Sequence, residues 1–348
     1  MSSPLFSPFR LRDLTLKNRI VFSPMLMYLA GNDGRVNDRH FVHYGARALG
    51  GTALVMTEVV AVTPRGRISA SDLGLWEDSQ VEGMRRISSF VHECGAALGV
   101  QLAHAGRKAR LDTQAQAPSA IAYDDDHALP ESLHETEMAR LREAYVQAAR
   151  RALAAGADLI EIHAAHGYLL HSFLCSLTNT RTDTYGGGRD GRARFVLEVV
   201  DAVRAVWPSE RPLAVRMSAY DPHVGGVSED DGLWFASQLA RRGVDLLDVS
   251  AGNLVPGHPT PVYPGYQVRH AEQVRIAAAI PVAAVGSLAS ADLMEEMLGA
   301  QRVDLVCVGR ELIRNPNWPI ECARRAGVDI QLPIATYARA SGPYERGF

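Results

Sequence analysis

Short apolar runs alternate with amphipathic stretches along the 348 residues of the chain, and this alternation predicts a parallel β-sheet covered by helices. Eight such strand–helix units favour the closed (β/α)₈ TIM barrel, an α/β fold of about 250 residues plus insertions. A doubly wound sheet is the alternative. Gly-x-Gly-x-x-Gly, the signature of its dinucleotide-binding unit, follows none of the candidate strands. The barrel is therefore the predicted fold.

The order of the elements follows from periodicity and from turn residues. The expected strands are Arg19–Met25, Ala53–Val62, Ala97–Ala103, Asp158–His163, Leu213–Ser218, Asp245–Ser250, Pro281–Val285 and Asp304–Val308. The expected helices are Asp78–Cys94, Glu137–Ala155, Arg192–Trp207, Asp230–Arg242, Gln267–Ala279, Ala291–Leu298 and Trp318–Ala326. Two apolar pieces in Met1–Lys17 read as a small hairpin or lid. We expect one domain over residues 1–348, with a tail from about residue 330.

Composition narrows the classes of partner. The hydrophobic content of 47% suits one large core, and a net charge of −3 offers no basic field, so nucleic acid is not an expected ligand. No run reaches the ~18 apolar residues of a membrane span. The four cysteines lack Cys-x-x-Cys spacing, which indicates neither a disulfide framework nor an iron–sulfur cluster. We expect a soluble, cytoplasmic protein without a membrane partner.

Chemically active side chains gather where the fourth strand ends, at His163, His166 and Tyr168. Two imidazoles can donate hydrogen bonds to an anion or to a polarised carbonyl, and a phenol with a pKa near ~10 can release a proton without being ionised at rest. The set predicts an acid catalyst beside an oxyanion-binding pair. Zinc held by the histidines and Glu161 is the alternative, but no third donor follows at helical spacing, so no metal is expected.

Glycine follows the seventh and eighth strands, at Gly286 and at Gly309, and Arg310 comes next. Loops at these two positions of a barrel frequently hold a phosphate through their amides, and glycine lets the backbone approach the anion. Each glycine alone could equally mark an ordinary tight turn. Together with the arginine they predict a phosphorylated ligand.

Two polar residues interrupt otherwise apolar strands. Arg216 stands in Leu213–Met217, where its charge must meet an anion or a carbonyl at the barrel mouth. A structural ion pair with Glu161 on the neighbouring strand is the alternative. Gln101 offers an amide that can both donate and accept. The two side chains suit a flat heterocycle with a mixed polar edge.

Five motifs spread over the chain carry a resemblance to a known family. They are Ser23-Pro-Met-x-Met-Tyr28, Gln101-Leu-Ala-His-Ala-Gly-Arg-Lys108, Ile162-His-Ala-Ala-His-Gly-Tyr168, Arg181-Thr-Asp-x-Tyr-Gly-Gly187 and Tyr344-Glu-Arg-Gly-Phe348. From about residue 5 to residue 348 the sequence resembles the old yellow enzyme family of FMN-dependent ene-reductases, in particular its thermophilic-like branch.

The resemblance implies an FMN lying across the barrel mouth. Its phosphate would rest on Gly286 and Gly309 with Arg310, while Arg216 would face the N1/O2 edge and Gln101 the pyrimidine edge. The residues implied for the remaining flank are Ser23, Pro24, Met25, Leu26 and Val59.

The same resemblance implies roles around the substrate. His163 and His166 would hold the carbonyl oxygen of an activated alkene, Tyr168 would protonate the carbon α to it, and Tyr28 would contact the substrate. Arg346 would reach the active site of a neighbouring subunit in a homodimer or homotetramer.

The implied reaction is ping-pong, because one pocket serves both halves. NADPH or NADH would give hydride to flavin N5, which would pass it to an enone, enal, maleimide or nitroalkene. Leu26 departs from the branch, which usually has a cysteine there. We therefore expect a flavin whose reduced form is less stabilised than in relatives.

Two other classes of function are weighed against the ene-reductase. A cofactor-free isomerase or lyase acting on a phosphorylated sugar could use His163 and His166 as acid and base, but with only Lys17 and Lys108 as lysines the chain is poorly suited to Schiff-base chemistry. A non-enzymatic binding barrel is disfavoured, because titratable groups converge on one face.

Overall fold

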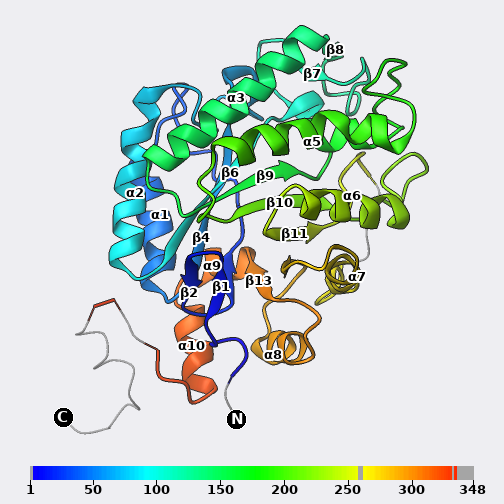
Figure 1. The fold of residues 1–348 in the computed structure, drawn as a ribbon. Coiled ribbons are helices and arrows are strands. Elements are labelled where there is room, and N and C mark those ends of the chain that lie inside the picture. The colour runs from blue at the N-terminus through cyan, green and yellow to red at the C-terminus, as the bar shows by residue number, and fades with distance from the viewer. Residues whose placement is uncertain (1–2, 258–261, 331–332, 335–348) are drawn as a thin grey trace, which may run out of the picture.

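The chain forms a closed ring of eight parallel strands in a computed structural model that describes residues 3–257, 262–330 and 333–334 (Figure 1). In ring order the strands are β3 (Ile20–Phe22), β4 (Leu54–Ala61), β6 (Ala97–Ala103), β9 (Leu159–Ala164), β10 (Leu213–Ser218), β11 (Leu246–Ser250), β12 (Val282–Ala284) and β13 (Leu305–Val308). Pairing of β3 with both β13 and β4 closes the ring. The predicted (β/α)₈ barrel is confirmed.

Helices surround this ring, one or more after each strand. They are α1 (Asp38–Leu49), α2 (Val81–Glu93), α3 (Glu135–Ala154), α4 (Leu169–Leu174), α5 (Arg189–Val206), α6 (Glu229–Arg241), α7 (Val268–Ala278), α8 (Ala291–Gly299), α9 (Arg310–Arg314) and α10 (Trp318–Arg325). Each predicted strand and helix is present, with ends shifted by a few residues. The sequence did not indicate α1, α4 and α9, of which the last two are only six and five residues long.

Helix α1 was missed because its third position lacks the glutamate or glutamine that usually completes a capping box. The Asn37 side chain accepts a hydrogen bond from the Arg39 amide at 3.1 Å, and His40 at the third helical position accepts one from the Asn37 amide at 3.2 Å. Histidine here fills the place that glutamate or glutamine takes in most capping boxes.

The interior of the barrel is apolar at one end and polar at the other. Because side chains alternate across a strand, β9 directs Leu159, Glu161 and His163 inward and Ile160 outward. The inward positions near the start of the strands form one apolar cluster with two leucines of the N-terminal segment. Its members are Leu11, Leu16, Val21, Ala53, Leu54, Met56, Ala97, Leu159, Ala214, Leu246, Ala283, Leu305 and Cys307.

The N-terminal hairpin closes the apolar end. Strands β1 (Phe9–Leu11) and β2 (Leu14–Leu16) pair antiparallel, and their two buried leucines, Leu11 and Leu16, belong to the apolar cluster inside the barrel. The predicted hairpin is thus present and seals the end of the ring from which the strands start.

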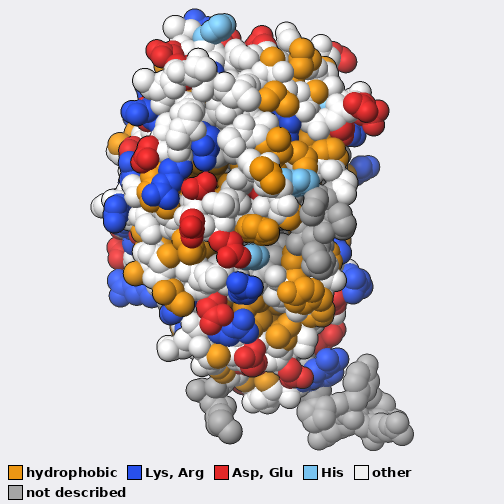
Figure 2. Space-filling model, turned by 90° about the vertical axis from the view of Figure 1, so that its right-hand side faces the viewer, with side chains coloured by type: hydrophobic (Ala, Val, Ile, Leu, Met, Phe, Trp, Pro, Cys, Tyr) orange, Lys and Arg blue, Asp and Glu red, His pale blue; other side chains and the backbone are white. Residues whose placement is uncertain are grey.

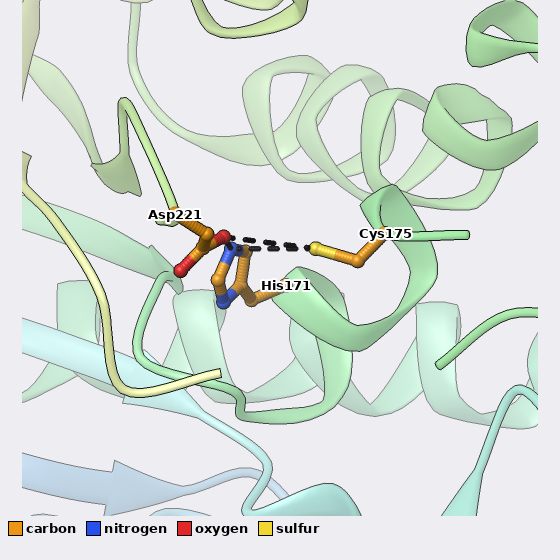
Figure 3. A group of neighbouring side chains, drawn as sticks. All are labelled: His171, Cys175 and Asp221. Carbon is orange, nitrogen blue, oxygen red and sulfur yellow. Dashed lines mark hydrogen bonds and ion pairs between the residues drawn. The ribbon is translucent and has the colours of Figure 1, made fainter. Parts of the chain in front are cut away.

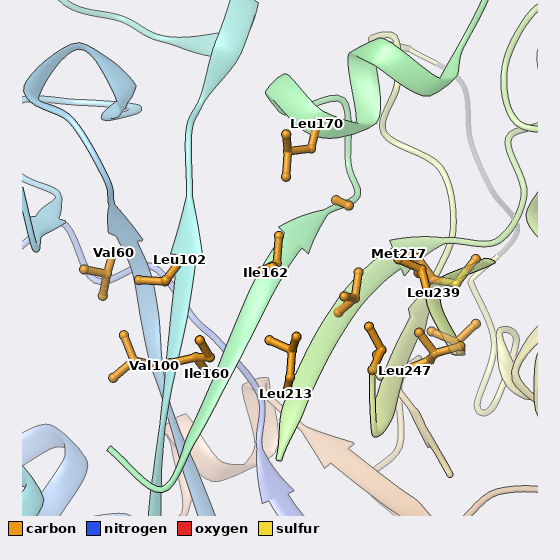
Figure 4. Close-up of a cluster of buried hydrophobic side chains, with 14 of the residues drawn as sticks. Val60, Val100, Leu102, Ile160, Ile162, Leu170, Leu213, Met217, Leu239 and Leu247 are labelled. Atoms are coloured by element: carbon orange, nitrogen blue, oxygen red, sulfur yellow. The ribbon is translucent and has the colours of Figure 1, made fainter. Parts of the chain in front are cut away.

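Outward-facing strand residues pack under the helices (Figure 4). Ile160 and Ile162 of β9, for example, are fully buried, and Leu239 reaches the same layer from α6. With both faces covered, β4, β6 and β9 are buried along their whole length, as parallel barrel strands are. This rigid layer leaves loops at the carboxyl ends of the strands free to carry a site.

Shorter elements lie outside the ring. Strand β5 (Leu73–Gly74) pairs in parallel with the end of β4, and β7 (Gln116–Ala117) pairs with β8 (Glu131–Ser132) in the excursion after β6. Single-turn 3₁₀ helices are Pro64–Gly66, Asp78–Gln80 and Gly106–Lys108. Among the described residues, no helix combines the length and the apolar character needed to cross a bilayer.

Candidate active site

The end of β9 brings three predicted catalytic residues together. His163 is the last inward residue of the strand, and His166 and Gly167 then adopt left-handed backbone angles, with φ of 58° and 74°. This tight turn folds the chain back. The His163 ring lies 5.2 Å from the His166 ring and 4.9 Å from the Tyr168 ring, nearly perpendicular to the latter. A phenol and two imidazoles therefore share one small volume.

The surroundings hold these groups in their neutral forms. Burial, and next the charge of Arg216, lower the pKa values of His163 and His166 well below the usual range of histidine. The Ala165 amide donates to His163 Nδ1 at 3.2 Å, so the proton of the neutral ring is on Nε2. Burial raises the pKa of Tyr168. The cluster thus presents the Nε2–H of His163, a neutral His166 ring and a protonated phenol.

Further groups fix the turn and border the phenol. Ser250 Oγ lies 2.6 Å from His166 Nε2. The Lys108 ammonium donates to the His166 carbonyl at 3.0 Å and lies 5.2 Å from the Tyr168 ring, and burial lowers the pKa of Lys108 to about 8. Tyr28, the predicted substrate contact, is 49% exposed. Figure 2 shows the face toward which the arrows of β9 and β10 point, where acidic and basic side chains are interspersed among hydrophobic ones.

A buried polar layer lies next to the apolar interior. Arg216 Nε is 3.1 Å from Asp248 Oδ2, and both side chains are at most 8% exposed. Glu161, the partner considered from the sequence, instead accepts a hydrogen bond from Gln101 Nε2 at 2.7 Å. Burial and the neighbouring Asp248 raise the pKa of Glu161 to about 8. Asp248 was missed, although a carboxylate within the apolar strand β11 was a readable signal.

A second buried carboxylate supports the segment after β3. Glu58 is fully buried in β4, where its Oε2 accepts from the Met27 amide at 3.0 Å and its Oε1 from the Tyr44 hydroxyl at 3.2 Å. Burial raises the pKa of Glu58 to about 7. Glu58 therefore anchors the backbone between Ser23 and Tyr28.

The ends of β3, β12 and β13 enclose a cavity of about 320 Å³. Seven of the predicted cofactor residues line it: Ser23, Pro24, Met25, Arg216, Gly286, Gly309 and Arg310. Gly286 has φ of 132°, and a Cβ there would stand 3.1 Å from the Tyr266 ring, so a side chain would narrow the cavity. Arg310 Nη2 donates to Ser287 Oγ at 3.2 Å, which holds the guanidinium at the cavity wall.

Among the described residues, the others predicted to bind the cofactor or substrate lie outside the cavity beside β12 and β13. Val59 of β4 is the register partner of Gln101 on β6, so these two adjoin each other at the mouth. Leu26 follows Met25 and is partly buried. None of these three lines the cavity beside β12 and β13. Arg346 and most of the predicted tail lie outside the described residues.

Comparison with known proteins identifies the family. Residues 4–326 match the model of the "NADH:flavin oxidoreductase / NADH oxidase family". The chain belongs to this family. An NADPH dehydrogenase of Geobacillus thermodenitrificans (strain NG80-2) is 47% identical over 349 residues, which cover 100% of this chain and 99% of that one.

Solved structures agree in fold and sequence. Morphinone reductase is 30% identical with a TM-score of 0.81, covering 96% of this chain and 92% of the other. An old yellow enzyme homologue from Zymomonas mobilis is 27% identical with a TM-score of 0.80, covering 95% of each chain. The resemblance to the old yellow enzymes is confirmed, and the protein is an oxidoreductase that uses FMN with a nicotinamide as hydride donor.

The residues at the barrel mouth fit an FMN. Gln101 Oε1 is buried and has no hydrogen-bond partner among the described residues, so it can accept from a heterocyclic N–H. Arg216 lines the cavity as a buried cation, and the glycines and Arg310 offer a place for a phosphate at its other side. These residues would hold the ring and the phosphate, respectively.

Proposed function

We propose that the protein reduces the carbon–carbon double bond of activated alkenes, such as enones, enals, maleimides and nitroalkenes, in a ping-pong reaction with NADPH or NADH. FMN, when bound, supplies the chemistry that accepts hydride from the nicotinamide and donates it to the β carbon of the alkene. The observation that carries the proposal is the cluster of neutral His163, neutral His166 and protonated Tyr168 at the end of β9.

His163 and His166 hold the carbonyl oxygen of the substrate. Negative charge builds on this oxygen as the double bond is reduced, and neutral N–H donors stabilise it most when it is fully developed. Comparable donors in oxyanion sites are each worth about 3–4 kcal/mol. The bonds of the histidines to Ala165 and Ser250 support this role, because they fix both rings before substrate arrives.

Tyr168 delivers the proton to the carbon α to the carbonyl. Its raised pKa keeps the phenol protonated at neutral pH, so a proton is always available at the start of the step. The phenol lies edge-on to His163, which places the acid next to the oxygen-binding pair. Tyr28 borders the substrate from the exposed side of the mouth.

The cofactor residues act by binding and orientation. Gln101 and Arg216 would hold the polar edges of the ring, and Gly286, Gly309 and Arg310 the phosphate. The flank would consist of Ser23, Pro24, Met25, Leu26 and Val59.

A two-stage experiment tests the proposal. The purified protein should be yellow and should oxidise NADPH or NADH in the presence of 2-cyclohexenone. Replacing Tyr168 by Phe should keep the bound FMN and its reduction by the nicotinamide but slow alkene saturation by about 10²-fold, the scale of a lost acid catalyst. A colourless protein that takes up no FMN, or a Phe variant with full alkene turnover, would contradict it.

The C-terminal residues complete a neighbouring site in this proposal. Arg346 would enter the active site of a second subunit in a homodimer or homotetramer. Deleting residues 344–348 should then reduce turnover while leaving FMN content and oligomeric state unchanged. Unaltered kinetics in the truncated protein would remove Arg346 from the site.

Leu26 sets the flavin potential in this proposal. Leucine can neither donate a hydrogen bond nor be oxidised, so it gives the reduced flavin no direct stabilisation. The flavin of the variant Leu26→Cys should have a higher reduction potential than that of the wild type in spectroelectrochemical titration. Leu26→Val is the control, since it changes the volume without adding a donor, and it should leave the potential close to that of the wild type.

A further inference from the structure

A second polar cluster, made of His171, Cys175 and Asp221, adjoins the turn His166–Tyr168, which we call the catalytic turn (Figure 3). His171 is on α4, Cys175 follows the end of that helix, and Asp221 comes three residues after β10. All three side chains are buried. His171 Nε2 lies 3.0 Å from Asp221 Oδ2 and 3.6 Å from Cys175 Sγ, and the sulfur is 3.9 Å from the same carboxylate oxygen.

The three ligand types could hold a divalent metal, and their mutual distances are compatible with one tetrahedral ion. The other ring nitrogen argues against this. The Gly167 amide donates to His171 Nδ1 at 2.8 Å, so Nδ1 must be unprotonated and the ring proton must be on Nε2. A neutral ring that binds a metal through Nε2 must carry its proton on Nδ1. That proton would face the Gly167 N–H, and two donors would then oppose each other. The ring therefore donates to Asp221.

The same hydrogen bond decides the charge of His171. Burial disfavours the charged ring, whereas Cys175 and Asp221 raise the pKa of His171, to about 10. The charged form, however, would carry an Nδ1–H that points at the Gly167 N–H over 2.8 Å. Because two donors cannot face each other at this distance, we assign the neutral ring with its proton on Nε2.

Gly167 is the middle residue of the turn that carries the catalytic groups. Its neighbour His166 is held through its amide by Ser218 Oγ at 3.1 Å and through its carbonyl by Lys108. The hydrogen bond of the buried Gly167 amide goes to His171. A Cβ at Gly167 would stand 2.7 Å from the Asn253 carbonyl, so the middle of the turn admits no side chain.

We propose that His171, oriented by Asp221, is a positioning residue that holds the His166–Tyr168 turn in its reactive geometry. The inference rests on the function proposed above for His166 and Tyr168. Asp221 is itself fixed, because its Oδ2 also accepts from the Val227 amide at 3.2 Å. A chain of hydrogen bonds thus runs from the loop after β10 through His171 to the catalytic turn on β9.

Loss of the His171 acceptor should slow oxidation of the reduced flavin by an alkene more than its oxidation by other oxidants. His171→Ala leaves the Gly167 N–H buried without a partner and lets the turn move. A displacement of about 1 Å at a reacting group costs about 10²-fold. We expect oxidation of the prereduced holoenzyme by 2-cyclohexenone, followed by stopped flow, to slow about 10–100-fold. Oxidation by dioxygen, which needs neither His166 nor Tyr168, should change less than about threefold.

Matched variants separate positioning from general damage. Asp221→Asn can keep an oxygen at the Oδ2 position, so it should preserve most of the alkene rate, whereas Asp221→Leu should behave like His171→Ala. His43 is a buried histidine on α1 that packs against Phe22. His43→Ala should lower stability without changing the ratio of the two oxidation rates. Equal slowing of both oxidants in His171→Ala would make the residue merely structural.

Two measurements do not depend on turnover. Nitrogen-15 NMR of the histidine-labelled wild-type holoenzyme should show His171 neutral and protonated on Nε2, and an imidazolium there would overturn the inference. Hydrogen exchange of the segment 164–170 should accelerate in His171→Ala and stay slow in Asp221→Asn. Stoichiometric zinc uptake that disappears in Cys175→Ala would make the cluster a metal site instead.

Tyr168→Phe distinguishes failure of this inference from failure of the proposed function. If Tyr168→Phe slows the alkene step and His171→Ala does not, positioning by His171 is wrong while the proposed reaction stands. If neither variant slows the alkene step, the function proposed for the turn is itself wrong.

Discussion

The two sides of the barrel mouth, at the end of β9 and at the ends of β12 and β13, differ in the charge of their side chains. At the end of β9, the buried His163 and the half-buried His166 are held neutral by their surroundings. At the ends of β12 and β13, the permanent cation Arg310 is exposed and stands among glycines. The first side suits charge that exists only briefly during a reaction, and the second suits a permanent anion such as a phosphate.

Desolvation accounts for the difference. A buried imidazolium beside Tyr168 would cost several kcal/mol before any substrate arrived, whereas a neutral imidazole N–H is inexpensive to bury and responds as charge develops. A phosphate keeps its charge throughout, so its partner can remain near solvent. Arg216, a buried cation of the mouth, is placed against Asp248. Substitutions on one side should therefore impair alkene reduction, and substitutions on the other side should impair FMN binding.

Removing both histidines tests the β9 side and should have the largest effect. In His163→Ala/His166→Ala the substrate oxygen loses its donors, each worth about 10²–10³ in related sites, so kcat/KM for an enone should fall by at least about 10³-fold. FMN content, measured by absorbance after gel filtration, should be unchanged. Retained alkene turnover, or loss of FMN together with activity, would contradict the division of the mouth.

Arg216→Leu tests the buried ion pair between the two sides. The variant leaves Asp248 buried without a counter-charge, and breaking such a pair typically costs about 3–5 kcal/mol. The free energy of unfolding, from urea denaturation of the FMN-free protein, should fall by an amount of that order. Arg310→Ala is the control, because it removes the same charge at an exposed position and should leave this free energy nearly unchanged.

The β12–β13 side is tested by the affinity for FMN. Hydrogen bonds to charged groups contribute about 1.5–3 kcal/mol, so Arg310→Ala should raise the Kd for FMN about 10–100-fold. The loss should shrink at high salt, because an exposed charge is screened. Fluorescence quenching of free FMN on binding measures both effects. An unchanged Kd would place the phosphate elsewhere.

Much of this arrangement could be predicted because it depends on strand periodicity. Alternation in Asp158–His163 placed Glu161 and His163 on one face, and the position of Gly286 and Gly309 after the last two strands indicated the cavity that they now line. The barrel itself followed from eight repeated units. These features are local in sequence and need no knowledge of distant contacts.

The missed features depend on contacts between distant segments. Whether Arg216 pairs with Glu161 or Asp248 is decided by the register of three strands, which the sequence alone does not give. The contact of His171 with Asp221 joins residues 50 positions apart through a short helix, α4, that has too few residues for a periodic signal. Such pairs become visible only when the barrel is closed.

Glu161 offers the smallest test, through the pH dependence of stability. Its pKa in the folded protein is about 8, above the value of 4.5 that is usual for glutamate. The stability that this protonated group contributes is fully present below pH ~4.5 and is lost as the pH rises through about 8, with a slope of at most about 1.4 kcal/mol per pH unit. The variant Glu161→Gln keeps the acceptor for Gln101 and cannot ionise. The free energies of unfolding of wild type and variant, from urea denaturation, should therefore diverge between pH 5 and 8. Parallel curves would mean that Glu161 is already ionised beside Arg216.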